Sequence, residues 1–184
     1  MSTIMAQLHQ DHINLSRLLD VLKTKLACLK SGERPDYQLL LDAITYIIDY
    51  ADAYHHPLED IIYRYAETQY PDQQAVLQEI EQEHVSIREA SASFQLLTEN
   101  ILHDAIVPMD QYTERLESFI DQQFAHLNHE EGRIFPMLDN TMTDNDWQSV
   151  IAQVTEQDDP LFGENVADEY KRLYRELMLD SEVA

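Results

Sequence analysis

Four long segments of this chain carry hydrophobic residues at alternating spacings of three and four. In the first, from about residue 2 to 29, the predicted inward positions are Met5, Leu8, His12, Leu15, Leu19, Leu22, Leu26 and Leu29. This period is that of an amphipathic helix with one buried face. Ser31 and Gly32 then predict the end of the helix. One histidine, His12, thus occupies a position that leucine otherwise fills.

The second and third segments have the same pattern, and each also has one histidine at an inward position. Asp36 is a predicted N-cap, and it precedes a face made of Leu41, Ile44, Ile48, Ala51, His55, Leu58, Ile62 and Tyr65. The sequence Tyr70-Pro71-Asp72 predicts the end of that helix and the cap of the next. The third face consists of Leu77, Ile80, His84, Ile87, Ser91, Phe94, Thr98 and Ile101.

A fourth helix is predicted after Val107, with Pro108 as its first residue. Its apolar positions are Leu116, Phe119, Ile120, Phe124, Leu127, Ile134 and Leu138. A capping-box-like start at residues 143–146 predicts a short helix, and residues 166–178 predict a last one. Long helices joined by short connections should run up-down-up-down. We predict an all-α, up-down-up-down four-helix bundle with one or two additional C-terminal helices. It would be a single domain over residues 1–184, with the bundle at about 2–139 and a helical extension at about 143–180.

Composition narrows the functional classes. With 184 residues the chain can bury one sizeable core, and only three glycines agree with long helices. A net charge of −23 argues against nucleic acid and anionic membranes as partners. One cysteine, Cys28, allows no internal disulfide and fits a reducing cytoplasm, which is the predicted location. The N-terminal sequence predicts neither a signal peptide nor a membrane span.

Two helices carry the same pair of metal-ligand residues. His126 precedes Glu130 by four residues, and His55 precedes Glu59 by four. Residues four apart share a helical face, so an imidazole and a carboxylate can reach one point. Either pair alone is also typical of a solvated surface, but two copies on two amphipathic helices favour a metal site. Pro57 predicts a bend or a loosened turn beside one pair.

Depth within the bundle supports the same interpretation. At ~1.5 Å of rise per residue, the candidate ligands lie about 14–21 Å from one end of the bundle. The residues at this level are His12, His55, Glu59, His84, His126 and Glu130. Core histidines without a common role need not share one level, so a site built from all four helices is predicted.

Several residues next to the candidate ligands have a role that periodicity alone does not decide. His56 is rotated by about 100° from His55, so we expect it on the outer side or behind the ligands. His56 and His129 are both predicted to be dispensable for metal loading. In the fourth helix, periodicity alone places Glu131 at least as far inward as Glu130.

Four histidines and two glutamates suit a transition metal such as iron. Two bridging carboxylates could hold two ions about 3.5–4 Å apart. Closed cysteine coordination of zinc is disfavoured by the single cysteine. A helical bundle without metal is the remaining structural alternative, although it would bury two glutamates at high cost.

These residues also resemble the hemerythrin-like family, the HHE cation-binding domains. The resemblance rests on His12, HHPLED at 55–60, Glu83-His84, HLNHEEGRIFP at 126–136 and the tail sequence DPLFG at 159–163. It implies a bundle around a non-heme, carboxylate-bridged diiron site, and it favours Glu130 over Glu131. The ligands that it implies are His12, His55, Glu59, His84, His126 and Glu130.

The sequence departs from the oxygen-carrying hemerythrins, which have a second histidine four residues away on the third helix. Here those positions are Ile80 and Arg88, so His9, His56, His129 or water would complete the site. We therefore predict a protein that binds or senses oxygen, nitric oxide or peroxide. The alternative is a diiron redox enzyme or iron donor, of the ferroxidase, peroxidase or cluster-repair type. Any signalling would need a partner protein, and a homodimer is a further open alternative.

Overall fold

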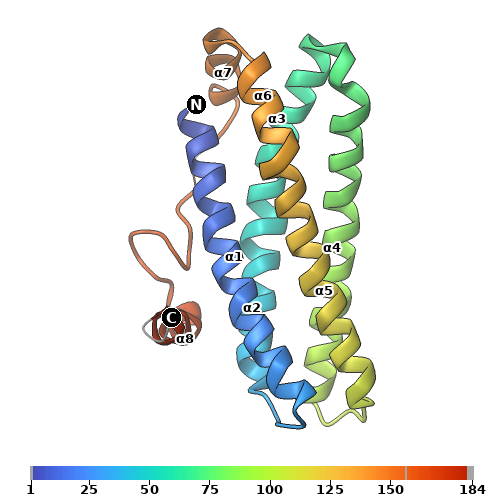
Figure 1. The fold of residues 1–184 in the computed structure, drawn as a ribbon. Coiled ribbons are helices and arrows are strands. Elements are labelled where there is room, and N and C mark those ends of the chain that lie inside the picture. Colours follow the sequence, from blue (N-terminus) through green and yellow to red (C-terminus); the bar gives the residue numbers. More distant parts are fainter. Residues whose placement is uncertain (1, 156, 182–184) are drawn as a thin grey trace.

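The computed structural model describes residues 2–155 and 157–181, and four long antiparallel columns of helix form its body (Figure 1). The first column is α1 (Thr3–Lys30), and the third is α4 (Gln74–Leu102). The second column consists of α2 (Tyr37–Tyr46), the π-helical segment η1 (Ile47–His55) and α3 (His56–Gln69). The fourth consists of α5 (Met109–His129), the π-helical segment η3 (Glu130–Ile134) and α6 (Phe135–Thr141). No strand occurs in the described ranges, and the predicted all-α bundle is confirmed.

Some helix ends follow local capping chemistry. The Ser2 hydroxyl accepts a hydrogen bond from the Met5 amide, and Gly32 has a φ of +84° directly after α1. Asp36 caps α2 as predicted, since its carboxylate accepts from two backbone amides. The predicted cap at Asp72 is wrong, because a short 3-10 turn, η2 (Pro71–Gln73), leads into α4 without a side-chain cap. Pro108 is the residue before α5 and not its first residue.

Two apolar clusters fill the bundle, one toward each end. Leu15, Ala51 and Leu127 belong to the larger cluster. Leu8 and Leu58 belong to the smaller cluster, which lies at the end of the bundle near α7. Full burial of one such side chain contributes about 1.5–3 kcal/mol relative to leaving it exposed. The predicted histidine of each of the first two columns lies between these clusters along the helix.

The C-terminal extension packs along the outside of the bundle. The Thr143 capping box is present and starts α7 (Asp144–Ile151) at one end. The chain then descends beside α1 to the 3-10 turn η4 (Asp168–Tyr170) and α8 (Lys171–Ser181), which packs against α1 and α2 (Figure 1). The extension therefore covers one side of the lower half of the bundle.

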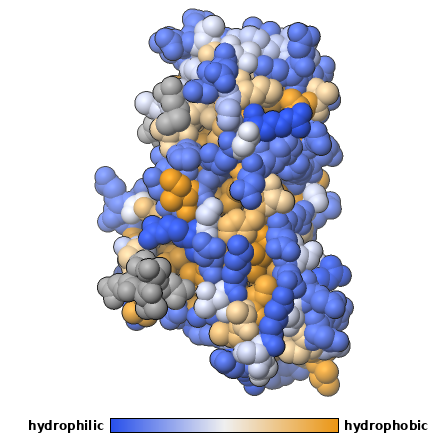
Figure 2. Space-filling view, viewed as in Figure 1, coloured by the Kyte–Doolittle hydropathy of each residue, from blue (hydrophilic) through white to orange (hydrophobic). Residues whose placement is uncertain are grey.

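The surface is mostly hydrophilic, in keeping with the net charge of −23. In the space-filling view, both ends are largely hydrophilic, and hydrophobic side chains gather along the middle of the visible face (Figure 2). Over the ranges that the structure describes, each helix is too short or too polar to cross a membrane.

Candidate metal centre

Six buried side chains from all four columns converge at one level of the bundle, as predicted. Glu59, on α3, is fully buried, and one of its oxygens is 3.4 Å from His12 Nε2 and 3.2 Å from His55 Nε2. The other Glu59 oxygen is 3.5 Å from His84 Nε2. The carboxylate therefore faces histidines of three different columns.

Glu130, at the start of η3, occupies the matching place on the fourth column. It is fully buried, with Oε2 at 3.3 Å from His12 Nε2 and 3.2 Å from His126 Nε2. Its Oε1 is 3.3 Å from His84 Nε2. Like Glu59, it spans the space between the histidines, which is the geometry that a bridging carboxylate needs.

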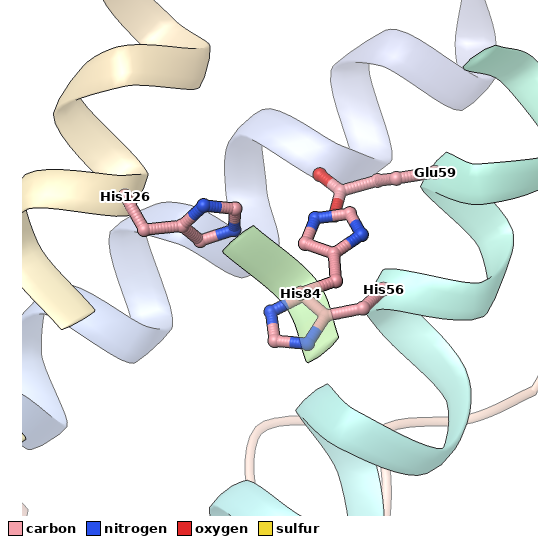
Figure 3. Close-up of side chains that lie close together, drawn as sticks. All are labelled: His56, Glu59, His84 and His126. Carbon is pink, nitrogen blue, oxygen red and sulfur yellow. The ribbon is translucent and has the colours of Figure 1, made fainter. Parts of the chain in front are cut away.

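The ligand atoms form two groups that share Glu59. One group is His12, His55 and Glu59, and the other is His56, Glu59, His84 and His126. In the second group, His126 extends from α5, His84 from α4, and the other two from α3 toward a common space (Figure 3). Two groups with a shared carboxylate are consistent with a binuclear metal site.

His56 lies inside this site, so its predicted position on the outer side is wrong. It is 1% exposed, and its ring stacks on His84 with centroids 4.5 Å apart. Its edge meets the ring of His126 at 5.3 Å. The physical reason is the π-helical segment before it, where the His56 amide donates to the Ala51 carbonyl five residues back. A wider turn changes the helical phase that a regular α-helix would give.

The structure buries Glu130 within the site and leaves Glu131 at its edge. The Glu131 side chain is 32% exposed, and its carboxylate lies 2.8 Å from His12 Nδ1, on the far side of that ring from the centre. The periodicity that placed Glu131 at least as far inward as Glu130 was wrong here, whereas the choice of Glu130 as a metal ligand stays a prediction. The π-helical segment η3 begins at Glu130, where regular α-helical phase again fails.

Each of the four predicted histidines has its own carboxylate behind it. The Nδ1 atoms lie 2.7 to 3.1 Å from acidic oxygens in the pairs His12–Glu131, His55–Asp11, His84–Asp60 and His126–Glu83. Such carboxylates fix the ring orientation and the tautomer, so that Nε2 faces the centre of the site. Sequence periodicity did not reveal Asp11, Asp60 and Glu83 as partners of these histidines. Each is adjacent in sequence to a predicted ligand, but each serves a histidine on another column, and only the fold reveals that.

The other two candidate histidines lie at the edge of the site. His9 Nδ1 is 2.9 Å from Glu131, and its side chain is 51% exposed. His129 Nδ1 is 2.9 Å from Glu83, and its side chain is 20% exposed. Neither belongs to the two ligand groups, so of the three candidates for a fifth histidine only His56 lies within the site.

The electrostatics of the site depend on charge pairing in the core. Burial lowers the pKa of His55, but Glu59 and Asp11 outweigh it and raise this pKa to about 9. For His84, the effect of burial is outweighed by Asp60 and Glu130, and its pKa is raised to about 10. Burial dominates at His56 and lowers its pKa to about 4. His56 is therefore neutral near pH 7, the state in which imidazole binds a metal.

Several atoms at the centre have no hydrogen-bond partner among the described residues. They are Nε2 of His12, His55 and His126, both oxygens of Glu59, and Oε2 of Glu130. A buried polar atom left unpaired costs about 1–3 kcal/mol, and more if it is charged. Cations at this level would pair every one of these atoms, so the residues present fit a metal centre.

The fold and the site thus define a helical-bundle protein with a buried histidine and carboxylate site for cations. Residues 3–138 match the family of the Hemerythrin HHE cation binding domain. The match covers well over half of the chain, and the chain belongs to this family. No match was found among curated proteins or among solved structures.

Proposed function

We propose that this chain is a non-heme diiron protein that binds or senses a small ligand such as oxygen, nitric oxide or peroxide. The observation that carries the proposal is the set of buried, unpartnered imidazole and carboxylate atoms at one level of the bundle. In this proposal His12 and His55 hold one ion, and His84 and His126 hold the other. Glu59 and Glu130 bridge the two.

The donor set favours iron. Imidazole and carboxylate ligands together suit iron, and two-metal sites hold their ions about 3.5–4 Å apart. Glu59 and Glu130 each lie within 3.5 Å of histidines assigned to both ions, as a bridge requires. Bound iron would supply reversible binding or reduction of the small ligand.

His56 could take the place of the second histidine that α4 lacks. The two α4 positions four residues from His84 are Ile80, which belongs to the apolar core, and Arg88, which is exposed. His56 instead approaches from α3 and stacks on His84. We propose His56 as the fifth histidine, on the side of His84 and His126.

One side of the centre is apolar, which suits oxygen and nitric oxide. Leu8, Ile80 and Ile134 are fully buried, and each lies one helical turn from a proposed ligand on the same face. Phe135 stacks on His12 with ring centroids 5.0 Å apart. These apolar groups exclude water from one side of the centre and leave room for few hydrogen bonds to a bound molecule.

A redox enzyme or an iron donor is the second candidate, and one residue favours it. Tyr63 is fully buried, and its hydroxyl donates to Glu130 Oε1 at 2.6 Å. A phenol at this place can deliver a proton to the centre, as ferroxidase or peroxidase chemistry would use. Binding alone has no need of that proton.

Rapid mixing of the ferrous, iron-loaded protein with oxygen, nitric oxide or peroxide tests the proposal. A reversible optical change on ligand addition and removal supports the binder. Repeated consumption of oxidant with a reductant present supports the enzyme. The variant Glu59→Ala is the matched control and should give neither response. Iron-loaded protein that shows no optical change with any of the three ligands would contradict both candidates.

A further inference from the structure

A row of stacked tyrosines runs between the second column and the C-terminal extension. The rings of Tyr46 and Tyr50 are stacked with centroids 5.7 Å apart and an interplanar angle of 16°. Tyr170, from η4, meets the Tyr46 ring edge-on at 5.5 Å. All three are 3% exposed or less. They therefore form a continuous aromatic contact inside the protein.

Each hydroxyl in this row donates to a different carboxylate. Tyr50 donates to Asp11 Oδ2 at 3.3 Å, and Tyr46 donates to Asp159 Oδ2 at 3.0 Å. Tyr170 donates to Asp49 Oδ2 at 2.8 Å. Asp11 and Asp159 are themselves buried, at 1% and 7% exposure. Burying phenols and carboxylates costs free energy that aliphatic side chains at the same positions would not incur.

One end of the row meets the metal centre, and the other meets the surface. The Asp11 oxygen that accepts from Tyr50 also lies 3.0 Å from Nδ1 of His55, a proposed iron ligand. At the far end, Asp49 is exposed. Contacts within hydrogen-bond or ring-stacking distance thus lead from His55 through Tyr50, Tyr46 and Tyr170 to solvent.

The outer half of the row is built by the extension, beyond the residues that match the family. Asp159 opens the DPLFG sequence, and its Oδ1 accepts from the amides of Leu161 and Phe162 at 2.8 and 2.9 Å. This turn fixes the carboxylate while its other oxygen receives Tyr46. A structural anchor would explain one such bond, but it would not explain three phenol–carboxylate pairs in ring contact that end at a metal ligand.

We propose that Tyr50, Tyr46 and Tyr170 conduct single electrons from the surface at Asp49 to the metal centre when hydrogen peroxide oxidises it. This inference rests on the proposed diiron function. Phenols are among the most easily oxidised side chains, and rings in contact allow an electron to move in short steps. The path would protect the centre by drawing oxidising equivalents away from it.

The step balances with hydrogen peroxide as the oxidant. Peroxide takes up two electrons, and two protons from solvent complete two water molecules. Two phenols each lose one electron and one proton and become neutral tyrosyl radicals. The proton of Tyr46 moves to Asp159, and that of Tyr170 moves to Asp49. A one-electron donor in solution, such as ascorbate, then reduces each radical, and the proton returns to the phenol.

The proton affinities agree with this direction of transfer. Burial, followed by the charge of Asp159, raises the pKa of Tyr46, which disfavours a free phenolate. Burial also raises the pKa of Asp159, although its backbone hydrogen bonds oppose the shift. Loss of an electron from Tyr46 is therefore coupled to transfer of its proton to a carboxylate of raised proton affinity.

The test uses the full, iron-loaded chain with its iron content measured first. After peroxide addition, freeze-quenched samples are examined by electron paramagnetic resonance, and oxidised tyrosines are located by peptide mapping. We expect a tyrosyl radical and oxidation at Tyr170 in the wild type. Tyr46→Phe keeps the ring but removes the hydroxyl, and oxidation at Tyr170 should be lost. Tyr50→Phe should give the same loss without altering the partner of Asp159.

Tyr112→Phe is the matched control, because Tyr112 is fully buried but its hydroxyl pairs with Thr98 and with no carboxylate. It should leave oxidation at Tyr170 unchanged. Equal Tyr170 oxidation in both path variants, or in iron-free protein, would overturn the inference, as would a radical confined to Tyr63. An iron-loaded protein with no oxidation at Tyr170 refutes the path alone. A protein that takes up no iron refutes the proposed function and the path together.

Discussion

Two columns of the bundle supply a histidine and a glutamate to the candidate metal site, and they differ from the two columns that supply a histidine alone. α1 and α4 are uninterrupted helices of 28 and 29 residues, and each supplies one histidine to the site. The second and fourth columns contain the π-helical segments η1, which ends at the candidate ligand His55, and η3, which begins at the candidate ligand Glu130. The interrupted columns supply both carboxylates, and the second also supplies two adjacent histidines.

The difference has a geometric cause. In both π-helical segments an amide reaches back five residues, from His56 to Ala51 and from Phe135 to Glu130. π-helical turns are rare and occur frequently at functional sites. A wider turn lets one column direct several candidate metal ligands toward a single point. An uninterrupted α-helix can present only about one side chain per turn to that point.

The largest effect should follow from removing a carboxylate of an interrupted column. Glu59→Ala takes away one bridge, so we expect loss of metal from the site. At a metal concentration about 1000 times Kd, binding contributes about 4 kcal/mol to stability, and the variant should lose this. The apolar clusters on either side should keep the helices associated, so circular dichroism should still show a helical protein. Elemental analysis and thermal unfolding measure the two losses.

Glu79→Ala is the matched control for that experiment, since Glu79 is an exposed acid on the uninterrupted α4. It should retain both metal and melting temperature. If verified removal of metal from the wild type left the melting temperature unchanged, the six candidate ligands would not form a stabilising metal site. They are His12, His55, Glu59, His84, His126 and Glu130.

A second test separates His56 from His129. His56 belongs to one of the two groups of side chains that could hold a metal, whereas His129 pairs with Glu83 at the edge of the site. We expect His56→Ala to lower the metal content on the side of His84 and His126, while His129→Ala keeps full loading. Metal content per chain and the absorption spectrum of the cobalt-substituted protein report both outcomes. Equal loading of the two variants would remove His56 from the ligand set.

The same comparison shows how far sequence periodicity reaches. On α1 every one of the eight predicted inward residues is buried, and on α4 only Ile101 of the eight is partly exposed. On the second column, Leu41 and Ile48 are partly exposed, whereas their neighbours Leu40 and Ile47 are fully buried. A pattern that assumes about 3.6 residues per turn cannot locate a π-helical turn. For that reason it did not predict that His56 lies inside the site.

The burial of the six candidate ligands at one level could be predicted from sequence, because each position depends on its own helix and on depth along it. The carboxylates behind the histidines were not, because Asp11 and Glu83 pair across columns. The tyrosine row was also hidden, since Tyr46 meets Asp159 across 113 positions of sequence. Contacts of this kind depend on how elements pack, and no local pattern encodes them.

Both kinds of column contain a histidine with a raised pKa, and the pH dependence of metal binding tests this. The pKa values of His55 and His84 are raised to about 9 and about 10, so each carries a proton at pH 7 that a metal must displace. Burial lowers the pKa of His12, but the carboxylates of Glu130 and Glu131 outweigh it and raise this pKa as well. With at least two protons released, the affinity should rise at least roughly hundredfold per pH unit up to about pH 9, and less steeply above that pH. Chelator competition with Co²⁺ at several pH values measures the slope.

The stability of the metal-free protein should fall as pH rises, whereas the metal affinity should increase. Because both pKa values lie above the ordinary histidine value of 6.5, these charged histidines stabilise the folded state fully below that pH. The stabilisation is lost as pH rises through 9 and 10, so the melting temperature of the metal-free protein should fall there. A metal affinity that does not change between pH 7 and 9 would show that the histidines are already neutral.

The smallest effect should come from a carboxylate behind a histidine. Asp60 lies 2.7 Å from His84 Nδ1, and Asp60→Asn keeps the shape but removes the charge. We expect metal affinity to fall roughly 10–100-fold, with loading still complete at high metal concentration. Asp121→Asn, at an exposed position of α5, is the same substitution away from the site and should have no effect. Equal affinities of the two variants would show that Asp60 does not support the ligand.

The central proposal is that five histidines, His56 included, and two bridging glutamates hold a pair of iron ions, and the iron content of the purified protein tests it most directly. The full chain, expressed with ample iron and purified without chelators, is analysed for all transition metals. The account predicts about two iron ions per chain, since two bridging carboxylates and terminal imidazoles suit a two-metal site. A single zinc ion per chain with no iron would contradict it.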